Sequence, residues 1–120
     1  MIRAFYILAV LAAAQPAAAQ EWMARRVGEI QALDKVNARV ATLRATVGEP
    51  TRFGTLTITL RACHTRPPDE VPDAAAWLEV SDERGGGGTQ PVFRGWLFAD
   101  APAVNMFEHP VYDLRILNCR

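Results

Sequence analysis

Polar and apolar residues alternate along two stretches of the chain. From Leu56 to Cys63 the even-numbered positions are apolar and the odd-numbered ones polar, with Cys63 on the polar side. In the last segment Tyr112, Leu114 and Ile116 form an apolar face, and Asp113, Arg115 and Cys119 share the other parity, with Leu117 as the exception. Side chains of a strand point alternately to its two faces, so this period of two predicts two half-buried β-strands. Each strand is expected to end in a cysteine that lies off its apolar face.

Two further segments predict a β-hairpin. One short apolar run covers Ala76 to Ser81, and the glycines at 85–88 separate it from a second run over Val92 to Phe98. A flexible glycine loop of this kind suits the return of an antiparallel strand. Trp96 shares one face of the second strand with Phe98, which predicts a core position for both aromatic side chains.

Prolines mark the breaks between these strands. Three of them fall between His64 and Asp73, where they predict an extended loop without a helix. The segment from Ala101 to Phe107 is predicted to form one helical turn, with Asp100 as its N-cap. The strands and breaks predict a mainly β fold, a small single-domain sandwich or barrel of about six to eight short strands with one disulfide and at most one short helix.

The region from Met23 to Val47 allows two interpretations. Its apolar residues recur every three or four positions, as in an amphipathic helix. The alternative is a hairpin that turns at 35–37 and continues in a second strand, Arg39 to Val47. This strand would place four apolar residues on one face, namely Ala41, Leu43, Ala45 and Val47. In the hairpin, Asp34 and Lys35 would form an exposed ion pair worth less than ~1 kcal/mol.

The first residues have the pattern of a removable export signal. Arg3 gives a positive start, Ala4 to Ala14 form an apolar core, and the small residues at 17–19 resemble a cleavage site. This core is too short to cross a membrane, and no later apolar run is long enough to do so. We therefore expect a cleaved signal peptide over 1–19 and a single periplasmic β-rich domain over 20–120, without a transmembrane segment after cleavage.

Charge excludes one class of partner. Without residues 1–19 the chain has twelve basic and thirteen acidic residues. Nucleic-acid binding needs a concentrated basic face, so nucleic acid is not expected as the main partner.

The chain contains two cysteines, Cys63 and Cys119. In an exported protein such a pair is most simply explained by a disulfide bond. Because both lie off the apolar faces, we expect a peripheral bond, worth about 4 kcal/mol in the chain-entropy model. The alternatives are a catalytic thiol and a zinc site with His64 and His109. Adjacent strand residues such as Cys63 and His64 point to opposite faces, which disfavours the zinc site.

Several short motifs of the chain suggest a family. They are Leu33–Lys35, Phe53–Leu56, Arg61–Cys63, Arg66–Pro68, Ala76–Val80, Phe93–Ala99 and Glu108–Asp113. Together with Cys119, they resemble Domain of Unknown Function 2155, a family of exported bacterial proteins. Two departures are Leu97, where methionine is expected, and residues 100–102. The resemblance implies export, two cysteines and a compact β-rich domain, with no established activity, and on this basis we favour the hairpin for Met23 to Val47.

Few residues offer catalytic chemistry. Ser81 is the only serine, and it lies at a predicted strand end. No other serine could act as the nucleophile of a serine triad. His109, with Glu108 before it and Asp113 nearby, is the best remaining group for a small hydrolase or metal-dependent enzyme. We prefer the alternative that this histidine, beside Pro110, makes structural hydrogen bonds. No catalytic residue, metal or cofactor is therefore assigned.

Most of the aromatic side chains are expected in the core, and a smaller exposed patch of aromatic and charged side chains is the remaining candidate for a binding surface. Trp77 and Trp96 could stack on sugar rings or hold a peptide strand, with Arg94 and Glu108 as polar partners. These four residues and His109 form the candidate surface. By elimination, we expect a non-catalytic binding or accessory module for an envelope protein or polymer.

Overall fold

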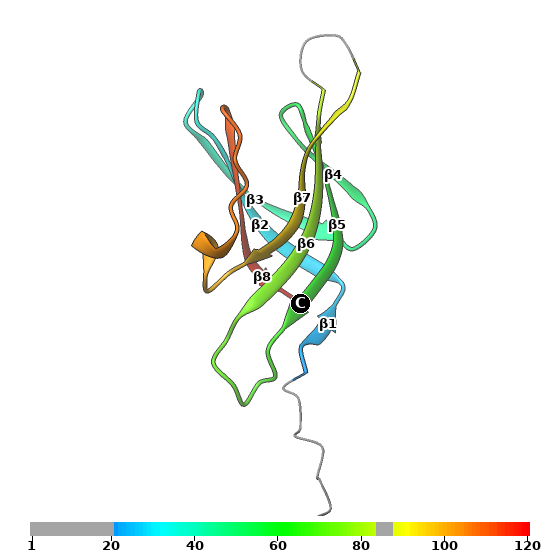
Figure 1. Ribbon diagram of the computed structural model, residues 1–120, viewed down its shortest axis with the longest axis vertical. Helices are drawn as coiled ribbons and strands as arrows, with labels where there is room; N and C mark the ends of the chain where they lie inside the picture. The colour runs from blue at the N-terminus through cyan, green and yellow to red at the C-terminus, as the bar shows by residue number, and fades with distance from the viewer. Residues whose placement is uncertain (1–20, 84–87) are drawn as a thin grey trace, which may run out of the picture.

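Strands dominate the structure, a computed structural model that describes residues 21–83 and 88–120 (Figure 1). The strands are β1 (Met23–Arg25), β2 (Val27–Asp34), β3 (Arg39–Thr46), β4 (Pro50–Phe53), β5 (Leu56–Thr65), β6 (Ala74–Asp82), β7 (Gln90–Phe98) and β8 (Tyr112–Cys119). One 3-10 helix, η2 (Pro102–Val104), lies between β7 and β8. The predicted signal peptide and residues 85–87 of the predicted glycine loop lie outside the described residues. The predicted mainly β fold is confirmed.

The strands form two antiparallel sheets. The larger sheet has the order β1-β5-β6-β7, and the smaller sheet has the order β3-β2-β8. Strand β4 also belongs to the larger sheet, because it pairs with the first half of β5 while β1 pairs with the second half. Figure 1 shows β5, β6 and β7 side by side. The predicted hairpin of β6 and β7 is therefore confirmed.

A single core lies between the two sheets. Buried side chains come from alternating positions of β5 and β6 in the larger sheet and of β2 and β8 in the smaller one. The largest apolar side chains in this core are Ile30, Leu56, Ile58, Leu60, Leu78 and Ile116. Burying a side chain of this size contributes about 1.5–3 kcal/mol, so the packing of the two sheets is the main source of stability. The alternation predicted for Leu56–Leu60 and for Tyr112–Ile116 is confirmed.

The contested region from Met23 to Val47 is a hairpin of β2 and β3. The two strands pair from Val27 with Thr46 to Asp34 with Arg39, and the helical interpretation is wrong. The face predicted for β3 is confirmed, because Ala45 is buried and Leu43 packs against the core. The three-to-four spacing misleads because it includes Val40, which is 62% exposed on the other face of β3. Pairing with β8 on the far side of β2 favours the extended form.

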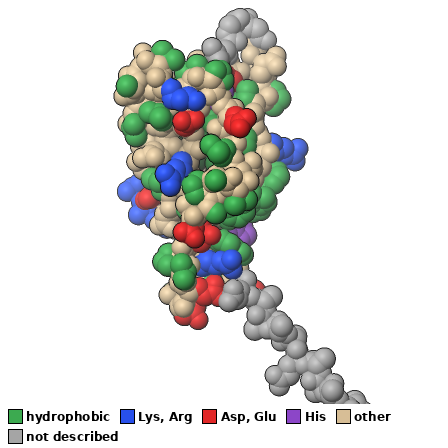
Figure 2. All heavy atoms as spheres, turned by 60° about the vertical axis from the view of Figure 1, so that its left-hand side comes forward, with side chains coloured by type: hydrophobic (Ala, Val, Ile, Leu, Met, Phe, Trp, Pro, Cys, Tyr) green, Lys and Arg blue, Asp and Glu red, His purple; other side chains and the backbone are tan. Residues whose placement is uncertain are grey.

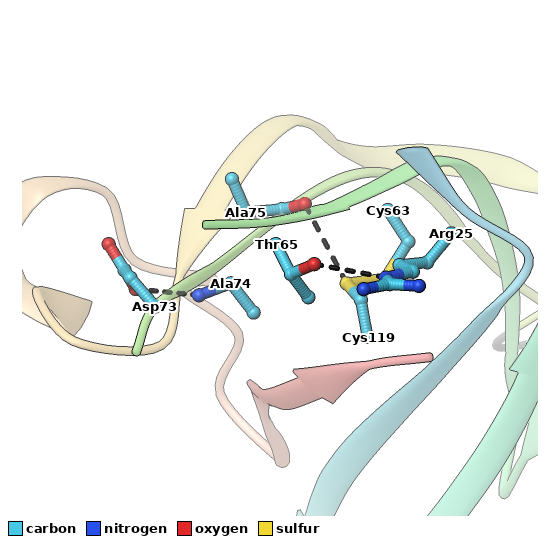
Figure 3. The surroundings of a disulfide bond; sticks show 7 residues. All are labelled: Arg25, Cys63, Thr65, Asp73, Ala74, Ala75 and Cys119. Atoms are coloured by element: carbon cyan, nitrogen blue, oxygen red, sulfur yellow. Dashed lines mark hydrogen bonds between the residues drawn. A yellow bond between two sulfur atoms is a disulfide. The ribbon is translucent and has the colours of Figure 1, made fainter. Parts of the chain in front are cut away.

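The disulfide bond between Cys63 and Cys119 is confirmed, but its predicted peripheral position is wrong. The two cysteines are 1% and 3% exposed, and their Cα atoms are 5.6 Å apart. The bond joins β5 of the larger sheet to β8 of the smaller one. Figure 3 shows it between these strands, with Sγ of Cys119 3.8 Å from the carbonyl oxygen of Ala75. The disulfide is thus a covalent bridge across the core.

One extra residue in each strand explains the error. The register of β5 on β6 skips Arg61, and the register of β8 on β2 skips Leu117. An extra residue of this kind is a β-bulge, and it reverses the alternation of the residues beyond it. Cys63 and Cys119 therefore return to the buried faces of their strands.

Two predictions for the segment around β7 are wrong. The core side of β7 is filled by odd-numbered positions such as Leu97, so Trp96 lies on the outer face and is 36% exposed. The N-cap of η2 is Ala101, which makes no side-chain hydrogen bond, rather than Asp100. The N–H of Asp100 donates to the carboxylate of Asp73 at 2.9 Å, which fixes the end of β7 instead.

Figure 2 brings the left-hand side of Figure 1 toward the viewer. Hydrophobic, basic and acidic side chains are interspersed on this side of the molecule. Over residues 21–83 and 88–120, no helix is long and apolar enough to cross a membrane.

Candidate functional site

Aromatic side chains gather on the outer surface of the larger sheet. Strand register places Trp77 of β6 directly opposite Trp96 of β7. The next row toward the C-terminal end of β7 holds His64, Ala75 and Phe98 on three neighbouring strands. Trp22 directly precedes β1, and its ring lies under the guanidinium of Arg66. We call this surface, formed by Trp22, His64, Trp77, Trp96 and Phe98, the aromatic face.

The rings of the aromatic face contact one another edge to face. The centroids of Trp77 and Trp96 are 5.6 Å apart with an interplanar angle of 77°, and those of His64 and Trp96 are 6.0 Å apart at 87°. This geometry is the one that aromatic quadrupoles favour, so the rings hold each other in place. Trp96 is the central member, because it contacts a ring on either side.

A hollow opens between these rings. It has a volume of about 310 Å³ and is lined by Trp22, His64, Ala75, Trp96 and Phe98. Ala75 is the smallest of the lining residues and is buried, so it forms the floor of the hollow and the larger aromatic rings form its walls. The volume lies at the small end of the range of ligand pockets. The hollow therefore suits a single ring or a short side chain.

Arginines border the aromatic face. Glu79 lies between Arg61 and Arg94, at 3.1 Å from Nε of the former and 3.6 Å from Nε of the latter. The guanidinium carbon of Arg94 is 5.9 Å from the ring centroid of Trp77, within cation–π range. At the other end, Arg66 lies 4.1 Å above the ring of Trp22. Positive charge thus flanks the aromatic rings at both ends.

The structure brings together three of the five predicted surface residues. Trp77, Trp96 and Arg94 are neighbours on the aromatic face. Glu108 is exposed on the connection between η2 and β8, whereas His109 is buried between the sheets. The predicted surface is therefore divided into an exposed part and a buried part.

His109 belongs to a buried polar cluster with Thr55, Asp82 and Tyr112. Its Nε2 lies 2.8 Å from Asp82 Oδ2, and the hydroxyl of Thr55 donates to the other carboxylate oxygen at 2.5 Å. The hydroxyl of Tyr112 accepts a hydrogen bond from the backbone N–H of Thr55 at 3.2 Å. His109 also stacks on Phe107, with ring centroids 5.7 Å apart and planes 6° from parallel. The cluster closes one end of the sandwich.

Both ring nitrogens of His109 make hydrogen bonds. Nδ1 accepts from the backbone N–H groups of Val111 at 3.0 Å and Tyr112 at 3.2 Å. A nitrogen that accepts carries no proton, so Nε2 is the protonated nitrogen and donates to Asp82. The side chain of His109 is only 3% exposed. This arrangement orients the backbone at the start of β8, and it offers no free nitrogen to a substrate.

The expected ion pair between Asp34 and Lys35 is wrong. Asp34 accepts hydrogen bonds from the backbone and side chain of Asn37, which close the turn between β2 and β3. Lys35 reaches across to β8, where Nζ lies 3.3 Å from Asp113 and donates to the carbonyl oxygen of His109 at 2.7 Å. The Asp34 carboxylate therefore closes the turn, while Lys35 ties the turn to β8 and to the backbone of His109.

Neither alternative use of the cysteines fits the geometry. The described residues contain no group of three or more histidine, cysteine, aspartate or glutamate side chains that could hold a metal ion. Within the same ranges no cysteine is free, which also rules out a cysteine nucleophile in this structure. The zinc site considered from the sequence would need Cys63 and Cys119 reduced.

Sequence reasoning missed Trp22, His64 and Arg66 as members of the site. Trp22 precedes β1, so no alternating pattern surrounds it. The missed signal for His64 was the bulge at Arg61, because the bulge reverses the two faces of β5 beyond it. Recognising that reversal would have placed Cys63 inside and His64 outside.

Comparisons with known proteins assign a family and no activity. A family described as "Uncharacterized protein conserved in bacteria (DUF2155)" matches residues 28–119. An uncharacterized protein of Rickettsia prowazekii is 25% identical over 92 residues, which cover 77% of this chain and 59% of the relative. The chain thus spans about three fifths of that relative's length. No solved structure matches. Because the match runs from β2 to the end of β8 and includes both cysteines, the chain belongs to the DUF2155 family of uncharacterized bacterial proteins.

Proposed function

We propose that the protein is a non-catalytic binding module of the bacterial envelope, exported by a signal peptide over residues 1–19 that is then cleaved. Its binding surface is the aromatic face. The observation that carries this proposal is the pair of Trp77 and Trp96, which lies on the outside of the larger sheet rather than in the core. Clustered aromatic side chains that remain accessible are typical of binding surfaces.

The geometry of His109 supports a non-catalytic role. A general base must reach the proton that it abstracts, and this histidine is buried with both nitrogens in hydrogen bonds. Asp113, the other group considered for the alternative hydrolase, faces Lys35 instead. The polar cluster therefore serves the fold, and the aromatic face is the better candidate for function.

Co-sedimentation with isolated bacterial envelopes tests this proposal. We expect the purified protein to sediment with the envelope and Trp96→Ala to lose most of this binding, because the central ring of the aromatic face is removed. Val92→Ala is the matched control, since Val92 lies on the same strand and is 37% exposed, against 36% for Trp96. Equal sedimentation of Trp96→Ala and wild type would overturn the proposal. So would failure of the wild-type protein to sediment.

A further inference from the structure

We infer that the ligand of the aromatic face is an acidic glycan, a polymer of sugar rings that carries carboxylate groups. Its rings stack on the tryptophans, and its carboxylates bind the arginines that border them. This inference rests on the proposed function and names the class of ligand. It follows from three features of the face, namely its hydrogen-bonding capacity, its shape and its charge.

Peptide recognition by strand addition needs a free sheet edge with unpaired backbone groups. Trp77 lies on β6, which pairs with β5 on one side and with β7 on the other. Trp96 and Phe98 lie on β7, an edge strand of the larger sheet, where the side-chain amide of Asn105 already donates to the carbonyl oxygen of Trp96 at 2.8 Å. A peptide strand added to this edge would lie beside the aromatic face rather than over it. On this face a ligand meets side chains only. Indole rings can bind the apolar face of a sugar without any backbone hydrogen bond.

The shape of the face fits rings. Trp77 and Trp96 stand nearly perpendicular, so together they form a corner with one ring face and one ring edge. On the other side of Trp96, the hollow of about 310 Å³ has Ala75 at its base and aromatic walls. A chain of linked rings could place one ring in the corner and another in the hollow, with Trp96 between them.

The charge of the face is complementary to carboxylates. Arg61 and Arg94 share the single carboxylate of Glu79, which leaves one positive charge in excess beside Trp77. The side chain of Arg94 is 75% exposed, and Nε is the atom nearest to Glu79. The terminal nitrogens of Arg94 therefore extend beyond this ion pair, and a guanidinium binds a carboxylate through two parallel hydrogen bonds.

A second arginine marks the far end of the face. Arg66 lies over Trp22, which is a wall of the hollow, and its ion pair with Glu70 is long, at 3.9 Å. Arg94 lies on β7 of the larger sheet, and Arg66 directly follows β5. Their cross-strand positions are six residues apart along the strand direction, which is about 20 Å by strand rise. Two arginines at this separation suit a polymer with repeated charges better than a single small acid.

Matched glycans test the inference directly. The probes are peptide-free glycan strands of peptidoglycan, whose sugars carry carboxylates, and the same strands with those carboxylates converted to neutral amides. Binding is measured by tryptophan fluorescence during titration. We expect the acidic strands to bind about tenfold more tightly than the amidated ones, a difference of ~1.4 kcal/mol. Raised salt should weaken binding of the acidic strands only, because it screens exposed charges.

Two variants locate the charge effect. Arg94→Gln should reduce the affinity for acidic strands by about tenfold and leave the affinity for amidated strands unchanged. Arg115→Gln is the control, because it removes the same charge from an exposed position on β8 of the other sheet. Circular dichroism and the unfolding midpoint confirm that each variant is folded.

The outcomes separate this inference from the proposed function. Equal binding of acidic and amidated strands, or equal loss of affinity in Arg94→Gln and Arg115→Gln, would overturn the acidic-glycan inference. If the protein sediments with envelopes through Trp96 but binds neither glycan, the proposed function stands and the ligand is a protein or another polymer. If it does not sediment with envelopes at all, the proposed function itself fails.

Discussion

Strand β8 is held to the larger sheet at both of its ends, by different chemistry. Its last residue, Cys119, is bonded covalently to Cys63 of β5, whereas its first residue, Tyr112, accepts a hydrogen bond from the N–H of Thr55, just before β5. In Figure 1 strand β8 begins toward the upper end of the sandwich and runs down toward the C-terminus. We call the end at Cys119 the covalent end and the end at Tyr112 the polar end.

The two ends depend on their surroundings to different degrees. The disulfide stabilises the fold mainly by restricting the unfolded chain, so its contribution depends on this one bond and little on the neighbouring side chains. The polar end is a network in which Asp82, His109 and Tyr112 each satisfy a buried neighbour. Losing one member leaves another unsatisfied, which costs more than the bond itself. We therefore expect one large contribution to the free energy of unfolding at the covalent end and several smaller contributions of different size at the polar end.

The largest effect is expected at the covalent end. Replacing both cysteines, in Cys63→Ala/Cys119→Ala, should lower the free energy of unfolding by about 4 kcal/mol, because the closed loop in the unfolded chain is lost. Urea denaturation followed by tryptophan fluorescence measures this change. Reduced wild-type protein is the control and should lose a similar amount. A double variant within ~1 kcal/mol of the oxidised wild type would show that the bond contributes little.

The next effect is expected for His109→Ala at the polar end. The change removes the acceptor for two backbone N–H groups and one partner of the buried carboxylate of Asp82. Breaking such a pair should lower the free energy of unfolding by about 3 kcal/mol.

Glu108→Ala is the neighbouring control for this variant. Glu108 is exposed, so its replacement should change the unfolding free energy by less than ~0.5 kcal/mol. Binding to envelopes should not change in His109→Ala at temperatures where the variant is folded. A loss of binding without a loss of stability would assign His109 a direct functional role instead.

A smaller effect is expected for Tyr112→Phe, which keeps the ring and removes the hydroxyl. The N–H of Thr55 then loses its acceptor, at a cost of about 1 kcal/mol. The same change in the Cys63→Ala/Cys119→Ala background completes a double-mutant cycle. The two ends are seven residues apart along β8, about 23 Å by strand rise, so the two costs should add. A coupling energy above ~0.5 kcal/mol would show that the ends act as one unit.

The smallest effect is expected for the turn between β2 and β3. Hydrogen bonds from the side chain and the backbone of Asn37 hold the pKa of Asp34 below its ordinary value of 3.8. A lowered pKa in the folded state means that the carboxylate stabilises the fold above this value, and that this contribution is lost as pH falls through the folded pKa. The unfolding midpoints of wild type and Asp34→Asn should therefore converge below pH 3.8.

Asp69→Asn is the control for this pH dependence. Asp69 is an exposed residue of the loop after β5, so Asp69→Asn removes the same charge away from the turn, and its unfolding midpoint is measured over the same pH range. A difference between wild type and Asp34→Asn that does not change with pH would contradict the role of the Asp34 carboxylate in the turn.

The sequence predicted those parts of the fold in which local pattern and burial agree. Alternation in Leu56–Leu60 and Tyr112–Ile116 corresponds to the two inner faces, because no bulge interrupts these stretches. The hairpin of β2 and β3 was favoured by the family resemblance, since its apolar spacing also fits a helix. Strand β2 of this hairpin also pairs with β8, and such a long-range contact cannot be predicted from local residue spacing.

The candidate site was predictable only in part, for a related reason. Trp77, Trp96 and Arg94 were named as surface residues, yet the same pattern also assigned Trp96 to the core. Parity along a strand defines two faces without stating which one is buried. Gly95 interrupts the apolar side chains on the core side of β7, between Phe93 and Leu97, whereas the other side carries the larger ring of Trp96. An apolar strand is usually aligned by its largest side chains, so the core side is easy to overlook.

Pairing of β2 with β8 also has a consequence for the order of folding. Gly28 lies opposite Cys119, so this pairing closes almost the whole described chain into one loop. Hairpins such as β2–β3 and β5–β6 join residues close in sequence, and local contacts of this kind form faster than distant ones. Docking of β8 is therefore expected to be the slow step. Until it occurs both cysteines remain unpaired, which makes oxidation a marker for completed assembly of the sandwich.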